Sequence, residues 1–270
     1  MMNTLWKKNV ATPKKPLVVL KLGGSSLQDP SVLTTVTKTI SDYRKYGYQV
    51  VLVHGGGPAI NAELTRRGIS WQFINGQRQT TPEMMSVIEE VLFGQMNQSL
   101  VDSLNQAKIP ALGFSGAENN TLFCTQTSIE LGQVGLVQSV NPKLIQQALN
   151  QPEEFVPVLA PLGVGRFGEK YNINADWAAC KLASALKADK LIFLTDQFGI
   201  LDQEGVLISK ISAQSLLDLV ENKVVTGGMY TKVLTILEAL KSGVSQVRVM
   251  SGQQAVDGLW SDMVGTVAHV

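Results

Sequence analysis

Two short glycine-rich segments follow apolar runs and carry residues suited to chemistry. Lys21-Leu22-Gly23-Gly24 comes directly after the apolar residues 17–20, and His54-Gly55-Gly56-Gly57-Pro58 follows the apolar residues 50–53. Glycine lets backbone N–H groups converge on an anion without interference from a Cβ atom. Either segment alone could be an ordinary tight turn. Two together, one of which begins with a lysine, favour an oxyanion or phosphate site.

Two familiar nucleotide motifs are absent or out of context. The sequence has no GxxxxGK[ST], which excludes a P-loop. Residues 163–168 match GxGxxG, but residues 169–174 do not resemble the start of a helix, so we interpret this match as a turn. His54 has no second ligand or acidic partner in its motif, and we interpret it as structural or as an orienter of the backbone.

The elements that must position these segments alternate along the chain. Apolar runs at 17–20, 50–53, 109–114, 155–160, 190–194 and 246–250 predict buried strands, and amphipathic stretches between them predict helices. The longest predicted helix covers residues 82–106. This alternation predicts an α/β fold, a three-layer αβα sandwich around an open, mostly parallel central sheet. Ligands of such sheets bind outside the carboxyl ends of the strands, where both glycine-rich segments lie.

Composition narrows the function classes. The chain has 270 residues, enough for one large domain, and its net charge of +1 provides no basic field for nucleic acid or anionic membrane. No apolar run is long enough to span a bilayer, and residues 1–15 do not have the pattern of a secretory signal. We therefore expect a cytoplasmic protein that acts on small molecules. Cys124 and Cys180 form no metal-binding motif, and burial is expected for both.

Six ordered motifs resemble those of N-acetylglutamate kinases, which belong to the amino acid kinase superfamily. The resemblance covers roughly residues 16–270. It implies a single domain over residues 1–270 with the amino acid kinase fold, an acceptor-binding lobe at about 16–165 and a nucleotide-binding lobe at about 166–270. The motifs are KLGG at 21–24, VHGGGP at 53–58, GQR at 76–78, NINAD at 172–176, TDxxGIL at 195–201 and TGGMxxK at 226–232.

The activity that the resemblance implies is ATP-dependent phosphorylation of the side-chain carboxylate of N-acetyl-L-glutamate, the second step of arginine biosynthesis. Lys21 and Lys232 would neutralise the transferring phosphoryl group, with Asp176 holding both lysines. The N–H groups of Gly24 and Gly57 would stabilise its oxygens. Mg²⁺ would be carried by ATP, and the resemblance implies no metal site built from protein side chains.

The resemblance also implies the binding residues. Arg78 would grip the α-carboxylate of the acceptor, with Gly56, Gly57 and Asn172 completing that pocket, although an exposed hairpin arginine is more often solubilising. ATP would lie against two segments of the second lobe. Their residues are Asp196, Gln197, Phe198, Gly199, Ile200, Leu201, Val224, Val225 and Thr226.

Several departures and alternatives stay open at this stage. Asn119-Asn120 stands where many members carry Asp-Gly, and Gln197-Phe198 replaces Val-Pro or Val-Asp. Arginine-inhibited members carry an N-terminal helix that links dimers into hexamers, whereas Pro13 and Pro16 disfavour a long helix here, so we expect a homodimer. One alternative is a sister kinase for acetylaminoadipate or a carrier-linked aminoadipate, because one methylene changes binding by only about 1 to 3 kcal/mol. The other is a catalytically silent member used as a sensor, which the retained lysines disfavour.

Overall fold

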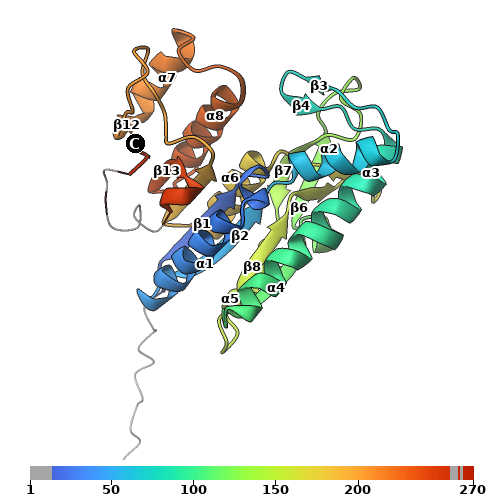
Figure 1. Ribbon diagram of the computed structural model, residues 1–270, viewed down its shortest axis with the longest axis horizontal. Helices are drawn as coiled ribbons and strands as arrows, with labels where there is room; N and C mark the ends of the chain where they lie inside the picture. Colours follow the sequence, from blue (N-terminus) through green and yellow to red (C-terminus); the bar gives the residue numbers. More distant parts are fainter. Residues whose placement is uncertain (1–13, 256–260, 262–263) are drawn as a thin grey trace, which may run out of the picture.

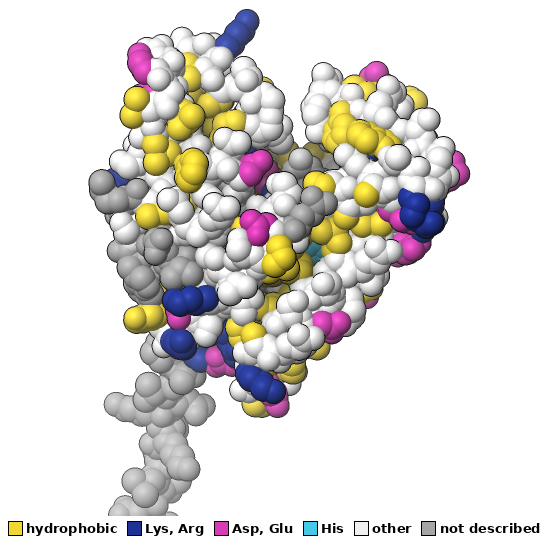
Figure 2. All heavy atoms as spheres, in the orientation of Figure 1, with side chains coloured by type: hydrophobic (Ala, Val, Ile, Leu, Met, Phe, Trp, Pro, Cys, Tyr) yellow, Lys and Arg dark blue, Asp and Glu magenta, His cyan; other side chains and the backbone are white. Residues whose placement is uncertain are grey.

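The computed structural model describes residues 14–255, 261 and 264–270. The expectations about the segment before the first strand concern residues 1–13 above all, and those residues lie outside the described part. The described part is wider at one end, where two groups of helices and loops rise on either side of the strands β1 and β2 (Figure 1). The space-filling view shows a notch between these two groups (Figure 2).

One eight-stranded sheet forms the centre of the molecule. All its neighbouring pairs are parallel except β13 and β14, so the mostly parallel sheet predicted from the sequence is confirmed. The order of its strands is β12 (Lys210–Ser212), β14 (Thr266–His269), β13 (Gln246–Ser251), β11 (Lys190–Thr195), β1 (Leu17–Leu22), β2 (Gln49–His54), β8 (Val156–Ala160) and β5 (Ala111–Ser115).

Helices cover both faces of this sheet, which confirms the three-layer architecture. Successive side chains of β1 point to opposite faces, so Val19 belongs to the hydrophobic cluster beneath one helical layer and Leu20 to the cluster beneath the other. Each fully buried aliphatic side chain stabilises this core by about 1.5 to 3 kcal/mol. The first layer holds α5 (Lys143–Leu149), α6 (Ala175–Leu186), α7 (Ala213–Glu221) and α8 (Gly227–Lys241), and the second holds α1 (Pro30–Lys45) and α4 (Gln98–Gln106).

The helix predicted over residues 82–106 is present, but its middle part is wound differently. It consists of α3 (Pro82–Glu89), a π-helical segment η2 (Glu90–Asn97) and α4, which follow one another without a gap. Thr81 caps its start, since its side chain accepts a hydrogen bond from the Met84 N–H, and Pro82 occupies the first turn. π-helical segments are rare and are frequent at functional sites.

Smaller elements complete the part of the chain that the structure describes. A four-stranded sheet contains β6 (Leu122–Gln126), β7 (Gly135–Val140), β9 (Leu162–Val164) and β10 (Lys170–Asn172), and β3 (Phe73–Ile74) pairs with β4 (Gln77–Arg78). The remaining elements are α2 (Gly57–Arg66), η1 (Ser26–Gln28), η3 (Glu118–Asn120) and η4 (Gly252–Gln254).

The GxGxxG segment begins in β9 and continues into the turn before β10. The Gly165 N–H donates to the Glu169 carbonyl, and a strand follows the turn directly, so the interpretation as a turn is confirmed. The division between lobes expected near residue 165 falls inside this hairpin. Because β10 pairs with β9, the antiparallel pairing groups the chain as far as Asn172 with the N-terminal half.

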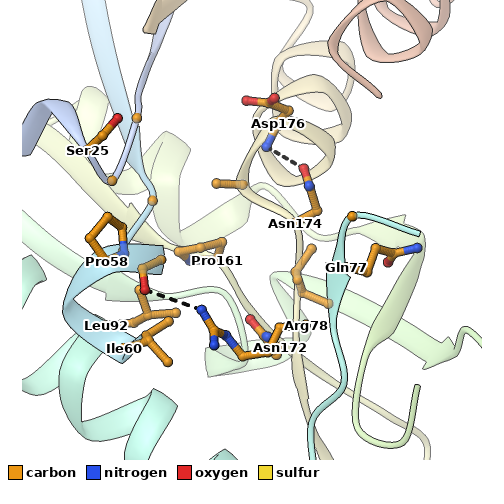
Figure 3. A pocket seen from close by; sticks show the side chains of 18 of the residues that line it. Ser25, Pro58, Ile60, Gln77, Arg78, Leu92, Pro161, Asn172, Asn174 and Asp176 are labelled. Atoms are coloured by element: carbon orange, nitrogen blue, oxygen red, sulfur yellow. Dashed lines mark hydrogen bonds between the residues drawn. The ribbon is translucent and has the colours of Figure 1, made fainter. Parts of the chain in front are cut away.

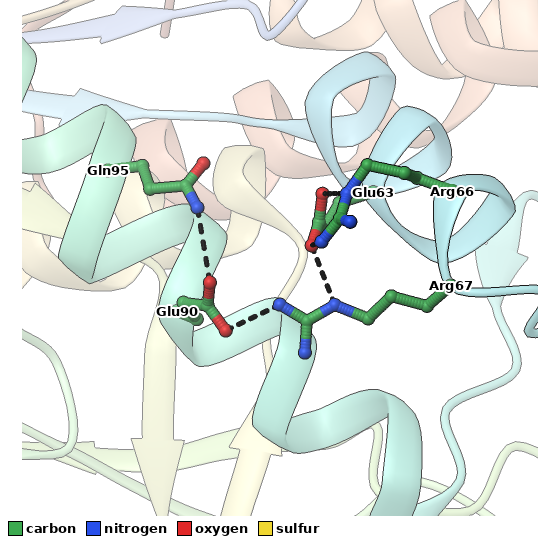
Figure 4. A network of polar contacts seen from close by, with 5 residues as sticks. All are labelled: Glu63, Arg66, Arg67, Glu90 and Gln95. Atoms are coloured by element: carbon green, nitrogen blue, oxygen red, sulfur yellow. Dashed lines mark hydrogen bonds and ion pairs between the residues drawn. The ribbon is translucent and has the colours of Figure 1, made fainter.

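A surface network joins α2 to the π-helical segment (Figure 4). Glu63 accepts hydrogen bonds from Arg66 and Arg67, and Arg67 also donates to Glu90 at 2.7 Å. Gln95 donates to the other oxygen of Glu90 at 3.3 Å. Exposed ion pairs of this kind contribute little to stability, so burial of the apolar faces of α2 and α3 holds these helices together.

Two other expectations concern burial and membranes. Cys124 and Cys180 are both buried, as expected, and neither forms a disulfide; burial raises the pKa of each thiol to about 12.

Among the described residues, no helix is both long enough and apolar enough to cross a membrane.

Candidate active site

A cavity of about 390 Å³ lies at the carboxyl ends of β1 and β2, and its side chains come from distant parts of the chain (Figure 3). β1 is flanked by β2 on one side and β11 on the other, so the chain leaves this strand at the point where the strand order reverses. The residues predicted from the sequence that line this cavity are Lys21, Gly24, Gly56, Gly57, Arg78, Asn172 and Asp176.

The two glycine-rich loops touch each other. A Cβ atom added to Gly24 would lie 2.8 Å from the backbone nitrogens of both Gly56 and Gly57. Gly55 donates its N–H to the Leu22 carbonyl at 2.8 Å, which ties the second loop to the end of β1. Only glycine at position 24 permits this approach. The loops therefore bring the N–H groups of Gly56 and Gly57 next to Gly24, at the wall of the cavity.

Asp176 lies between two lysines from different halves of the chain. Lys21 Nζ is 2.7 Å from Asp176 Oδ1, and Lys232 Nζ is 2.7 Å from Asp176 Oδ2. All three side chains are buried. Burial opposes the charge on Asp176, but the ammonium groups of Lys21 and Lys232 outweigh it and lower the pKa of Asp176 to about 2. Burial also lowers the pKa of Lys232, although Asp176 opposes that shift.

The start of α6 fixes the position of Asp176. Asn174 is the N-cap of this helix, and its Oδ1 accepts hydrogen bonds from the N–H groups of Asp176 and Trp177. The first of these bonds is drawn in Figure 3. A carboxylate in the first turn is also favoured by the positive end of the helix dipole. The motif Asn-Ile-Asn-Ala-Asp therefore supplies both the cap and the charged residue.

Arg78 on β4 is buried, not solvated. Its guanidinium lies over the rings of Phe73 and Trp71, with distances of 4.8 and 5.3 Å to the ring centroids. Nη2 donates to the Gly57 carbonyl at 3.3 Å, whereas Nη1 is buried and has no hydrogen-bond partner among the described residues. Burial lowers the pKa of Arg78 to about 10, so the group is charged at neutral pH. A buried cation with an unused donor is suited to an anionic ligand.

Asn172 lies beside Arg78 in the cavity (Figure 3). Its side-chain amide donates to Thr80 Oγ1 at 3.2 Å, and its backbone N–H donates to the Gln133 carbonyl. These two contacts leave the carbonyl oxygen of the side chain available to accept a hydrogen bond from a ligand.

A second cavity, of about 730 Å³, lies on the other side of Asp176. Two of the predicted nucleotide residues do not line it. Phe198 is 58% exposed, and Ile200 is fully buried, with its N–H bound to Thr266 Oγ1 at 2.8 Å. The predicted residues that do line it are Asp196, Gln197, Gly199, Leu201, Val224, Val225 and Thr226, together with Asp176 and Lys232.

Four residues line both cavities, namely Gly76, Asn174, Asp176 and Thr195. The roles predicted from the sequence do not include Gly76, Asn174 or Thr195. Thr195 is the last residue of β11, and Lys21 lies near the end of the neighbouring strand β1. Because ligands of such sheets bind at the carboxyl ends of the strands, the position of Thr195 at a strand end is the signal that could have identified it. The two cavities therefore meet at the Lys21–Asp176–Lys232 cluster, and a group could pass from one to the other there.

Residues 16–251 match the model of the amino acid kinase family. The chain belongs to this family. Among its curated relatives is the acetylglutamate kinase of Geobacter sulfurreducens, 39% identical over an alignment of 248 residues; the match covers 87% of this chain and 84% of the relative. The acetylglutamate kinase of Ruegeria pomeroyi is 38% identical and matches 88% of this chain and 82% of its own.

Solved structures with the same fold match nearly the whole of this chain. The structure of smu.665 from Streptococcus mutans has a TM-score of 0.80 and 28% identity, and the match covers 94% of this chain and 98% of that one. Carbamate kinase from Giardia lamblia shares the fold at 18% identity, with a TM-score of 0.67 and coverage of 95% and 99%.

Proposed function

We propose that this chain transfers the γ-phosphoryl group of ATP to the side-chain carboxylate of N-acetyl-L-glutamate, giving N-acetyl-L-glutamyl 5-phosphate and ADP in arginine biosynthesis. The acetylglutamate kinases among its relatives support the substrate. The observation that carries the reaction is the Lys21–Asp176–Lys232 cluster between two cavities, because phosphoryl transfer needs positive charge between donor and acceptor.

The proposed chemistry needs no strong general base. A glutamate-like carboxyl has a pKa of about 4.3 and is ionised at neutral pH. One of its oxygens forms a bond to the γ-phosphorus, while the bond from that phosphorus to the β,γ-bridging oxygen breaks and its electron pair leaves with ADP. Lys21 and Lys232 neutralise the negative charge that spreads over the phosphoryl oxygens, and the N–H groups of Gly24 and Gly57 bind those oxygens.

We assign acceptor binding to the first cavity. The Arg78 guanidinium would bind the α-carboxylate in a bidentate manner, for which its unused Nη1 is available. Gly56, Gly57 and Asn172 would contact the rest of the acceptor. This assignment makes the N-terminal half, as far as about residue 172, the acceptor lobe.

We assign ATP to the second cavity in the C-terminal half. Asp196, Gln197, Gly199, Leu201 and residues 224–226 would contact the nucleotide, and Phe198 and Ile200 would act through the shape of the same loop. Mg²⁺ would enter bound to the phosphates of ATP, because the charge of a triphosphate needs a divalent counterion during transfer.

We further propose a cytoplasmic homodimer. Strand β5 ends the central sheet on one side, and such an edge presents backbone groups to which another chain can pair. Leu112 on this strand is 39% exposed. Measurement of the mass in solution by light scattering tests the dimer, and a monomer or a hexamer contradicts it.

The activity is tested with protein, MgATP and N-acetyl-L-glutamate in the presence of hydroxylamine, which traps an acyl phosphate as a hydroxamate. Formation of hydroxamate that depends on both substrates supports the proposal, and its absence contradicts it. The same assay with N-acetyl-L-aminoadipate measures the preference for chain length. Faster turnover of that longer acid would indicate that the chain phosphorylates acetylaminoadipate instead of acetylglutamate.

A further inference from the structure

His54, the last residue of β2, is completely buried beneath the second glycine-rich loop. Its Nδ1 lies 3.0 Å from the Gly55 carbonyl oxygen, and its Nε2 lies 3.2 Å from the Nδ2 of Asn97. Asn97 is itself 1% exposed and ends the π-helical segment η2. The two side chains thus connect the long helix to the loop that forms a wall of the first cavity.

The neighbours of Asn97 define its orientation. Its Nδ2 donates to the Val158 carbonyl at 2.9 Å, so an oxygen cannot occupy that position without repulsion. The Asn97 Oδ1 lies over Gly113, where a Cβ atom would be only 2.2 Å away. The amide therefore presents its second N–H to His54, as the contact distance requires.

This orientation selects one form of the imidazole ring. Because Nε2 faces a donor, it must accept, and the proton of the neutral ring lies on Nδ1. Nδ1–H then donates to the Gly55 carbonyl. Burial lowers the pKa of His54 to about 4, which agrees with a neutral ring at neutral pH.

The Gly55 carbonyl and the Gly56 N–H belong to the same planar peptide unit and point in opposite directions. Holding the carbonyl therefore also sets the direction of that N–H. The Gly56 N–H has no hydrogen-bond acceptor among the described residues and lies at the start of α2, where helix N–H groups are free to bind an anion. Gly56 lines the first cavity beside Gly24.

We propose that His54, held by Asn97, is a positioning residue that aims the Gly56 N–H at the anion in the first cavity. His54 itself touches neither substrate nor phosphoryl group. The inference rests on the proposed function for the identity of the anion, but the ring form and the peptide orientation do not depend on it.

Two substitutions of His54 separate positioning from packing. In His54→Asn the side-chain amide nitrogen takes the place of Nδ1 and keeps a donor for the Gly55 carbonyl. In His54→Gln the amide lies nearer the place of Nε2, which keeps a partner for Asn97 but removes the donor to Gly55. We expect kcat/KM for the acceptor to stay within about 10-fold of the parent in His54→Asn and to fall by about 100-fold in His54→Gln, as for a lost oxyanion donor. The KM for ATP should change little in either variant.

The thermal midpoint of each variant measures how much the substitution disturbs packing. If His54 acted through packing alone, the losses of kcat/KM would follow the losses of thermal stability. Equal losses of kcat/KM in the two variants, or losses that follow the two melting temperatures, would overturn the proposal. An opposite order of kcat/KM would overturn it as well.

The ring form is measured directly by nitrogen NMR on the whole protein without substrate. The chain has only two histidines, so the signals of His54 are assigned by comparison with His269→Gln. We expect a protonated Nδ1 and a bare Nε2 from about pH 6 to pH 8. A proton on Nε2 would contradict the proposal even if hydroxamate formation confirms the kinase activity, and a protonated Nδ1 would support it even if that activity fails.

Discussion

Lys232 on α8 donates a hydrogen bond to Asp176 on α6 at 2.7 Å, although 56 positions separate the two residues in the chain. The other oxygen of this carboxylate meets Lys21 on β1. One buried carboxylate therefore fixes the distance between two cations, one on a strand of the N-terminal half and the other on a helix of the C-terminal half.

Asp176→Asn should destabilise the protein by about 3 to 5 kcal/mol at neutral pH, because it leaves two buried ammonium groups without a negative partner. The loss should depend on pH. The pKa of Asp176 is about 2 in the folded chain and has an ordinary value of 3.8, so the carboxylate stabilises the fold fully above about pH 4. That stabilisation is lost as the pH falls from about 4 to about 2. Urea titrations of both proteins at several pH values measure the difference, and a gap that widens toward acid contradicts this assignment.

Lys21→Ala should lower kcat by about 100-fold or more, because it removes one cation from the transferring phosphoryl group. Steady-state kinetics with both substrates measures this, and the KM for the acceptor should change much less. Lys38→Ala is the matched control, since the Lys38 side chain is 60% exposed and pairs with Asp42 on the surface of α1. A kcat equal to that of the control would remove Lys21 from the mechanism.

Arg78→Lys should raise the KM for the acceptor by about 10- to 100-fold, because lysine keeps the charge but loses the planar fork and its second donor. The KM for ATP should stay near the parent value. Arg66→Lys on the surface of α2, where the arginine side chain is 69% exposed, should leave both constants unchanged. An acceptor KM that is unaffected by Arg78→Lys would refute the bidentate contact.

Gly24→Ala should lower kcat/KM by at least about 10-fold and the stability by about 1 to 3 kcal/mol, since the new Cβ would lie 2.8 Å from two backbone nitrogens that cannot move independently. Gly94→Ala provides the comparison. A Cβ atom at Gly94 meets nothing within 4 Å, and the position is exposed and helical, so that variant should be as stable as the parent or slightly more stable. Steady-state kinetics measures kcat/KM and thermal melting measures the stability of both variants. Full activity in Gly24→Ala would show that the two glycine-rich loops need not touch.

Much of the fold follows from local patterns in the sequence. The continuous apolar residues of β1 indicate a strand that is buried on both faces. In α1, the spacing of Val32, Val36 and Ile40 indicates a helix that is buried on one face. Those patterns depend on side chains a few positions apart, so they survive without knowledge of the tertiary structure. The π-helical winding of residues 90–97 gives no such signal, because its apolar residues suit an α-helix equally well.

The site was predictable to a different extent. The motifs identify Lys21, Asp176 and Lys232, but the contact between Lys21 and Asp176 joins β1 to α6, which are far apart in the chain, and no local pattern reports it. The nucleotide segment shows the limit clearly: its sequence does not reveal that Phe198 faces outward while Ile200 enters the core. The burial of Asn97 could not be predicted either. In the sequence, a polar residue of a long amphipathic helix looks like one on the solvent-exposed face, and only its neighbours in the structure show that it is buried.

The place of β1 in the middle of the sheet has a consequence for how the molecule holds together. This strand pairs with β2 of its own half and with β11 of the other half over five residues or more on each side. Neither half can therefore keep its hydrogen bonds if the other is removed, and the two should melt in one cooperative transition. A chain cut between them would expose a row of apolar side chains in both fragments, so the enzyme depends for its folding on the same junction at which its two cavities meet.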